Sequence, residues 1–196
     1  RINRIFEGTN EINRLLIPGT LVKKALKGEI ALMEKAQNLQ NELLQLVPGQ
    51  TFEGTLEQET HFLDMMKKIF LLAGGLAVQK FGTKLEQEQE ALSNLADMMI
   101  DMFALESALL RARKHIARTS EEKATNMIEM TQVFAYEAFQ RIETLAKETL
   151  ASVESGDMLR MQLSVLKKLT RSNPVDTVAL KRSIAARIVK NERYTV

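Results

Sequence analysis

The segment from Thr83 to Ser155 contains neither glycine nor proline, the two residues that fit least well inside a helix. Within this segment apolar residues recur every three or four positions, first over 92–110 and then over 127–142. Such spacing predicts two long helices, each with one apolar stripe. Alternation of the strand type is absent from the whole chain, so a strand-rich fold is excluded.

Start and stop signals define three long helices. The helices are expected to end near Phe81, Arg118 and Val153. A threonine precedes each helix, and a Gln or Glu follows that threonine three residues later, which is the pattern of a capping box. The three capping residues are Thr55, Thr83 and Thr119. Long helices joined by tight turns pack antiparallel. We therefore predict an all-α fold: an antiparallel up-and-down helical bundle of three long helices with shorter flanking helices.

Shorter helices are predicted on both sides of the bundle. At the N-terminal side, an apolar run after Thr9 is expected to stop at Pro18-Gly19 and to resume briefly as far as Gly28. A further helix is expected over about 30–47. At the C-terminal side, we expect one helix over 158–171 and another, capped by Asn173-Pro174, that ends near Lys190.

The stretch 69–78 is apolar on every side. It is much shorter than the roughly 20 residues that a membrane span requires. We therefore expect a buried central helix rather than a surface for a membrane or a partner. Gly74-Gly75 within it is compatible with a close helix–helix crossing.

Residue usage excludes several kinds of chemistry. The chain has no Cys, which rules out disulfides and thiolate catalysis and fits a reducing compartment, so a cytoplasmic location is expected. Its only histidines are His61 and His115, which argues against histidine-based metal sites and catalytic triads. The chain starts at Arg1 without an initiator Met or a signal peptide, and we interpret it as a fragment of a longer polypeptide.

Charge is unevenly distributed. Residues 157–196 carry nine basic and three acidic side chains, whereas residues 1–156 carry a net negative charge. A basic segment can bind nucleic acid, anionic lipid or an acidic protein surface. Aromatic residues of the kind that stack on bases are not interspersed here. We therefore expect this segment to pack on the acidic remainder of its own protein, and we expect no nucleic acid partner.

The segment with the most specific residues lies near the N-terminus. Glu7 is placed in the loop before a helix, next to Gly8, which permits close backbone approach. Thr9 and Asn10 supply capping groups at the positive end of that helix, which suits a polar or anionic group of a cofactor. These features alone are more often those of an ordinary helix cap.

The ten residues Phe6–Leu15 read aromatic-Glu-Gly-Thr-x-x-Ile-x-Arg-Leu. This pattern resembles the carboxyl-terminal signature of the acyl-CoA dehydrogenase family. In the medium-chain and very-long-chain branches, the glutamate of the signature is the base that removes the α-proton of the acyl-CoA thioester. By this resemblance Glu7 is the catalytic base, Gly8 contacts the substrate, and the flavin adenine dinucleotide (FAD) is bound by Thr9, Asn10 and Glu11.

The resemblance also implies a function for the whole protein. It implies dehydrogenation of a fatty acyl-CoA to the trans-2-enoyl-CoA in fatty acid β-oxidation. The implied partners are an electron-transfer flavoprotein and further copies of the same chain, and no metal is implied. Membrane association is possible but not expected. Since the family needs upstream domains to enclose the flavin, we expect residues 1–196 alone to bind no FAD and to be inactive.

The chain extends far beyond the signature. Residues 1–28 are expected to form the end of the catalytic helical domain, and 29–196 a C-terminal helical extension. An extension of this length resembles the very-long-chain branch and its larger bacterial relatives, and the text of 95–111 resembles a helix pair of the catalytic domain itself. A second Phe-Glu-Gly-Thr occurs at 52–55, but its context does not repeat the signature, so Glu53 is interpreted as part of a helix cap.

Other carboxylates are weaker candidates. Glu57 and His61 are four residues apart and could share a metal, although an ion pair or a solvated face is the expected outcome. Asp97, Asp101 and Glu106 interrupt an apolar helix and are expected to pair with Arg111, Arg113 or lysines. Glu106, on the apolar stripe, is the residue for which a buried partner is expected.

A second class of function is open for the isolated chain. It could serve as a non-catalytic helical module for oligomerisation, membrane association or docking of a partner. This alternative and the enzymatic one are compatible for the parent protein.

Overall fold

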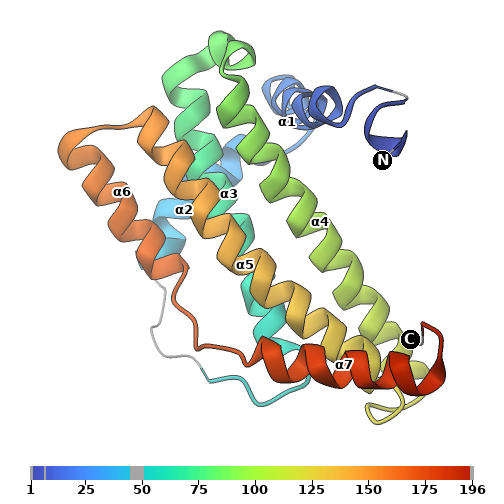
Figure 1. Ribbon diagram of the computed structural model, residues 1–196. Coiled ribbons are helices and arrows are strands. Elements are labelled where there is room, and N and C mark those ends of the chain that lie inside the picture. Colours follow the sequence, from blue (N-terminus) through green and yellow to red (C-terminus); the bar gives the residue numbers. More distant parts are fainter. Residues whose placement is uncertain (1, 7, 45–50, 195–196) are drawn as a thin grey trace.

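The computed structural model describes residues 2–6, 8–44 and 51–194, and over these residues it consists of helices and loops (Figure 1). The elements are η1 (Ile2–Arg4), α1 (Asn10–Leu26), α2 (Leu32–Leu44), α3 (Glu57–Phe81), η2 (Gly82–Gln87), α4 (Gln89–Arg118), α5 (Thr125–Val153), α6 (Gly156–Leu169) and α7 (Thr177–Asn191). The predicted all-α class is confirmed.

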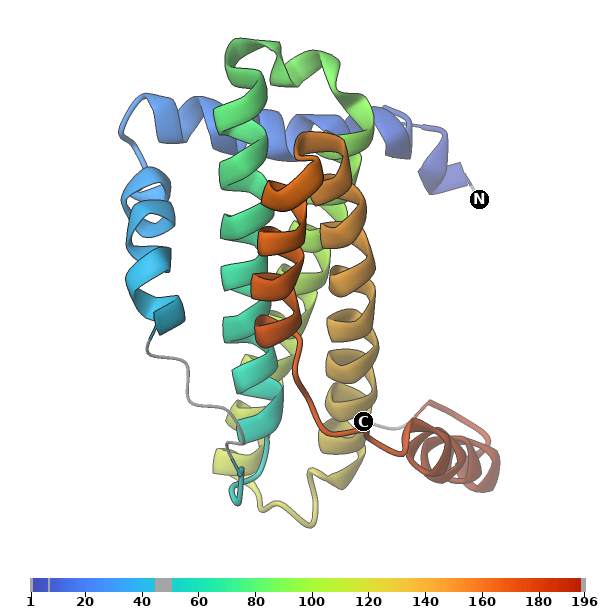
Figure 2. The ribbon, with the colours of Figure 1, turned by 90° about the vertical axis from the view of Figure 1, so that its left-hand side faces the viewer.

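Helices α3, α4 and α5 run up, down and up, and α6 returns along α3 and α5 (Figure 2). The three long helices have 25, 30 and 29 residues. Helix α1 crosses the upper ends of α3 and α4, while α2 lies along the outer side of α3. The predicted up-and-down bundle with shorter flanking helices is therefore confirmed.

The bundle core is centred on two stacked aromatic rings from α3 and α5. The rings of Phe62 and Phe139 lie 4.5 Å apart at an interplanar angle of 13°, and each side chain is at most 2% exposed. Further fully buried side chains belong to the same core, among them Met66, Ile69, Met98, Leu105, Ile142 and Leu150. Small residues of α5, including Ala135 and Ala138, are buried where this helix meets its neighbours.

The predicted apolar stripe of α4 is buried only in part. Leu92, Leu95 and Leu109 are buried as expected. Phe103 and Leu110, which were assigned to the same stripe, are 74% and 63% exposed. Leu92 and Leu110 are about five helical turns apart and point in the same direction. Helix α1 packs on the upper part of α4, near Leu95, and leaves Phe103 and Leu110 uncovered further down, so this part of the core prediction was wrong.

The apolar stretch 69–78 belongs to α3 and lies in the centre of the bundle. Ile69, Ala73 and Ala77 have no exposed surface, which confirms the expected buried helix. Among the described residues no helix combines the length and the apolar character needed to cross a membrane.

Gly74 and Gly75 lie where α3 meets α4 and α2. A Cβ atom built on Gly75 would lie 3.8 Å from the Cβ of Ala36, and one on Gly74 would lie 3.5 Å from a methyl group of Leu95. Both distances are ordinary van der Waals contacts. The helices approach closely here, as expected, but they leave room for a methyl group.

Gly75→Ala is therefore expected to raise the free energy of unfolding by about 0.5–1 kcal/mol, because alanine loses less backbone entropy than glycine inside a helix. Thermal unfolding followed by circular dichroism measures the change. The control is Gly82→Ala, which should destabilise the protein because Gly82 has φ +53°. A loss of stability at Gly75 would mean that α2 cannot accommodate the methyl group.

The predicted ends of the long helices agree with the structure, but the predicted capping boxes do not. Helix α3 begins after Leu56, which adopts a left-handed conformation (φ 61°) and is 1% exposed. Burial of this side chain displaces Thr55 from the capping position. Thr83 lies in η2 rather than at the start of α4, and a turn separates Thr119 from α5.

Helix α1 continues through Pro18, where an interruption was predicted. Proline inside a helix costs about 3 kcal/mol because it lacks an N–H group and its ring meets the preceding turn. Here Pro18 is buried, and it lines a small apolar cavity together with Leu21 and Val22 of α1 and Phe70 of α3. We attribute the continuity of the helix to this burial. Helix α2, in turn, is described only as far as Leu44, so the predicted end near 47 lies outside the described residues.

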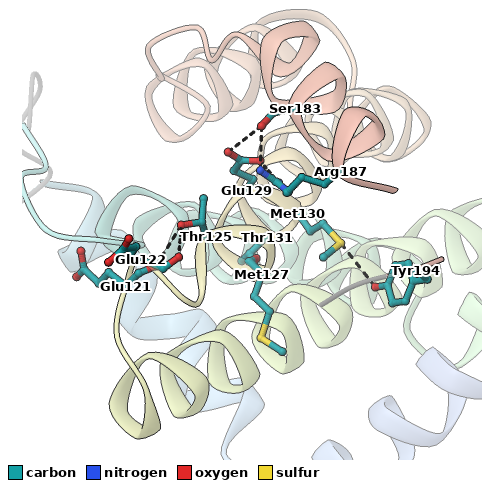
Figure 3. A network of polar contacts seen from close by, with 10 residues as sticks. All are labelled: Glu121, Glu122, Thr125, Met127, Glu129, Met130, Thr131, Ser183, Arg187 and Tyr194. Atoms are coloured by element: carbon teal, nitrogen blue, oxygen red, sulfur yellow. Dashed lines mark hydrogen bonds and ion pairs between the residues drawn. The ribbon is translucent and has the colours of Figure 1, made fainter. Parts of the chain in front are cut away.

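Helix α7 crosses the lower end of α5 and is attached to it by charged side chains (Figure 3). Arg187 pairs with the carboxylate of Glu129, which also accepts a hydrogen bond from Ser183 at 3.2 Å. Lys181 pairs with Glu137 of the same helix. Basic residues of the C-terminal segment thus contact acidic residues of the bundle, as predicted. The helix is capped by Asp176, not by Asn173-Pro174, because the Asp176 carboxylate accepts from Ala179 N–H at 2.9 Å.

Candidate functional site

The signature segment forms the start of α1. Gly8 has φ +86°, and a Cβ there would lie 2.9 Å from Oδ1 of Asn13, so this position requires glycine. Thr9 caps the helix by accepting a hydrogen bond from Ile12 N–H at 3.4 Å. The Asn13 side chain donates to the Gly8 carbonyl at 3.1 Å. The loop and the first helical turn are therefore one hydrogen-bonded unit, with the predicted cap at Thr9 confirmed.

The residues predicted to bind cofactor and substrate are accessible. Gly8, Thr9, Asn10 and Glu11 are exposed, and Phe6 is 63% exposed. Glu7, the predicted base, lies outside the described residues. Since the described part of the chain leaves this segment uncovered, a closed site at the start of α1 requires further protein on its exposed side.

An ion pair joins the signature segment to the bundle. The guanidinium of Arg14 binds both carboxylate oxygens of Asp97 on α4, with Nε 2.8 Å from Oδ1. Both side chains are about 30% exposed, so the pair is partly shielded from water. Two-point contacts of this kind fix direction as well as distance. Sequence analysis placed Arg14 in the signature and Asp97 in an ion pair but did not connect the two.

Two further carboxylates of α4, Asp101 and Glu106, also form ion pairs. Asp101 binds Arg141 of α5 through two contacts of 3.0 and 2.9 Å, and this hydrogen bonding raises the pKa of Arg141. Glu106 pairs with Lys67 of α3 at 2.8 Å. Pairing itself was predicted correctly, but Arg111 and Arg113 are not the partners. Glu106 is half exposed rather than buried, because it points away from the stripe that faces the core.

The remaining candidate site residues, Glu57 and His61, contact the loop that precedes α3. The Glu57 carboxylate accepts a hydrogen bond from Gly54 N–H at 3.0 Å, while the ring of His61 packs on Phe52 at 4.9 Å. Burial lowers the pKa of His61 and raises the pKa of Glu59, which is 5% exposed. Glu53 is exposed, in keeping with a residue next to a helix start. Within the described residues no group of three or more potential ligands could hold a metal ion.

Among the described residues a small cavity and an open groove can be distinguished, and neither suits an acyl chain. The first lies between α1, α2 and α3, is lined almost entirely by apolar atoms, and has a volume of about 30 Å³. Small-molecule sites usually occupy several hundred cubic ångströms. The second is an open groove of about 300 Å³ between α4 and α5, with Asp97, Asp101 and Arg141 at its wall. Its charged groups are already paired with one another or with Arg14.

Comparison with known proteins identifies the family. Residues 65–168, from α3 to the end of α6, match the family described as acyl-CoA dehydrogenase, C-terminal domain. This match covers more than half of the chain, and the chain belongs to the acyl-CoA dehydrogenase family.

Individual relatives agree with this assignment. A probable acyl-CoA dehydrogenase of Bacillus subtilis is 53% identical over the whole chain. A crystal structure of an acyl-CoA dehydrogenase complexed with FAD from Bacillus anthracis superposes on the whole chain with a TM-score of 0.96 at 52% identity. FadE10, a probable acyl-CoA dehydrogenase of Mycobacterium tuberculosis, is 27% identical over 81% of the chain. The chain spans about a third of the length of the two Bacillus proteins.

Proposed function

We propose that this chain is the base-bearing C-terminal part of an FAD-dependent acyl-CoA dehydrogenase that converts fatty acyl-CoA to trans-2-enoyl-CoA. The observation that carries the proposal is the signature segment at the start of α1, in a chain of this family. The proposal assigns 1–28 to the end of the catalytic helical domain and 29–196 to the extension.

In the proposed reaction, the carboxylate of Glu7 removes the α-proton of the thioester. Gly8 allows the backbone to approach the thioester, and its positive φ supports this role because only glycine fits there. An FAD held by Thr9, Asn10 and Glu11 would supply the acceptor for the β-hydrogen, which leaves as hydride. The protein's own contribution is to align the two C–H bonds with the base and the cofactor.

The exposed groups at the start of α1 fit a polar cofactor. Thr9, Asn10 and Glu11 surround the positive end of the helix dipole, where polar or negatively charged groups are favoured. Since these groups are exposed, they are free to contact a ligand held by the remaining two thirds of the protein. We propose them as FAD contacts in the complete enzyme.

The test compares the full-length protein with residues 1–196 expressed alone. The full-length protein should purify with flavin absorbance, which fades on anaerobic addition of a saturated acyl-CoA as the flavin is reduced. The separate fragment should carry no flavin, because a single exposed helix start cannot enclose one. Flavin absorbance in the purified fragment would contradict the proposal that residues 1–196 alone bind no FAD. A flavin that stays oxidised in the full-length protein after addition of acyl-CoA would contradict the proposed dehydrogenation.

The wider assignments rest on family membership and composition. We propose fatty acid β-oxidation as the process, an electron-transfer flavoprotein as the acceptor, and a homo-oligomer as the assembly. The absence of Cys supports a cytoplasmic location.

A second function, docking, is favoured by the distribution of exposed apolar side chains. Ile100, Phe103 and Leu110 follow one face of α4, at spacings that place them side by side on a helix. The N-terminal region adds Ile5, Phe6, Ile12 and Leu16, all more than half exposed. Because the Bacillus relatives are about three times as long, we propose that these residues pack on the rest of the same polypeptide.

A further inference from the structure

The two halves of α1 are attached to the bundle in different ways. The C-terminal half, from Pro18 to Ala25, is held by apolar contacts with α2, α3 and α4, and both of these end residues are buried. The N-terminal half exposes Ile12 and Leu16 by 55% and 60%. Its described links to the bundle are the packing of Leu15 on the core and the Arg14–Asp97 ion pair.

The ion pair fixes the direction of the helix start. Arg14 lies about 6 Å along the helix axis from Asn10, at a rise of 1.5 Å per residue. Its two-point contact with Asp97 resists rotation of α1 about its own axis, which a single contact would permit. Because both side chains are half-buried, water weakens this pair less than it weakens exposed ion pairs.

The same rigid unit ends at Gly8. The hydrogen bonds from Asn13 to Gly8 and from Ile12 to Thr9 connect the first turn to the loop that precedes it. Gly8 follows Glu7 directly in the sequence. Rotation of the first turn would therefore displace the backbone to which the Glu7 side chain is attached.

We infer that Asp97, a residue of the extension bundle, is a positioning residue for the proposed base Glu7 and acts through Arg14. The inference rests on the proposed function. It gives the bundle a direct part in the reaction: α4 supplies the carboxylate that orients the base-bearing helix. A displacement of about 1 Å in a reacting group can slow a reaction by as much as 10²-fold.

The test is Asp97→Asn in the full-length FAD-containing enzyme. Asparagine keeps the shape of the side chain but removes the charge, so the two-point contact is lost. We expect kcat to fall roughly tenfold, with KM for acyl-CoA and flavin content unchanged. The deuterium isotope effect measured with substrate labelled at Cα should increase, because proton removal becomes more fully rate-limiting. Asp97→Glu, which restores the carboxylate, should recover most of kcat.

Asp101→Asn is the matched control. Asp101 lies one turn further along α4 and binds Arg141 in the same two-point manner, but its partner belongs to α5 and not to the signature segment. The two variants should lose similar thermal stability, whereas only Asp97→Asn should change kcat and the isotope effect.

Equal losses of kcat in the two variants, or no loss at Asp97, would overturn the inference while leaving the proposed function intact. Glu7→Gln, measured beside them, separates the two ideas. If Glu7→Gln retains near-normal turnover, the proposed function fails and the inference fails with it. If Glu7→Gln is inactive and Asp97→Asn is normal, only the inference fails.

Discussion

Glu7→Gln in the full-length enzyme is expected to lower kcat by roughly 10²–10⁴-fold, the range usually supplied by a general base. The amide cannot accept the α-proton, yet it has nearly the same size and leaves the surrounding contacts in place. Flavin content should therefore stay normal, and acyl-CoA should still bind. The measurement is anaerobic flavin reduction by acyl-CoA, together with the flavin absorbance of the purified variant.

The chain provides a matched control in its second Phe-Glu-Gly-Thr sequence. Glu53→Gln changes the same residue in the same four-residue context at 52–55, next to α3 rather than α1. It should leave flavin reduction unchanged. Near-normal turnover of Glu7→Gln would mean that another residue is the base. A large loss of flavin reduction in Glu53→Gln would mean that Glu53, and not only Glu7, contributes to the reaction.

Phe139→Ala is expected to destabilise the bundle by about 3–5 kcal/mol, the usual cost of removing a phenyl group from a packed core. Phe139 is 1% exposed and stacks on Phe62 at 4.5 Å. The pair joins the first and third long helices, so its loss weakens the α3–α5 contact directly. Denaturant unfolding of the helical signal measures the effect.

Phe139→Leu should cost much less, because most of the volume remains. Phe103→Ala removes the same group from a side chain that is 74% exposed in this chain. In residues 1–196 alone it should change stability by less than about 0.5 kcal/mol. A larger loss in the full-length protein would support the proposed packing of Phe103 on the rest of the polypeptide. An equal loss at Phe139 and Phe103 in residues 1–196 would contradict the assignment of Phe139 to the principal core.

Sequence patterns predicted the ends of the long helices better than their starts. Gly82 has a positive φ, which other residues adopt only with strain. The end of α3 is therefore determined by the residue at this position and can be predicted from the local sequence. The start of α3 depends instead on burial of Leu56, which outweighs the capping preference of Thr55. The continuity of α1 through Pro18 likewise depends on contacts with other helices. Local preferences cannot report such tertiary effects.

The ion pairs illustrate the same limit within the candidate site. Arg111, Arg113 or a lysine was expected as the partner of Asp97, whereas its partner is Arg14, 83 residues away. Asp101 and Glu106 pair with residues 40 and 39 positions away. The signal that could have indicated Arg14 was its place in the signature, on a helix expected to pack against the bundle. The signature itself predicted Gly8 and Thr9 correctly because glycine geometry and helix capping are local.

The distance in sequence between Arg14 and Asp97 also has a consequence for biosynthesis. The signature segment is synthesised well before α4, so a nascent chain carries the proposed base before it carries the carboxylate that orients it. Helical bundles generally fold within micro- to milliseconds. A polypeptide that ends between α1 and α4 would contain the complete signature without its anchor. If the proposed roles of Glu7 and Asp97 hold, the base is oriented only after α4 has been synthesised.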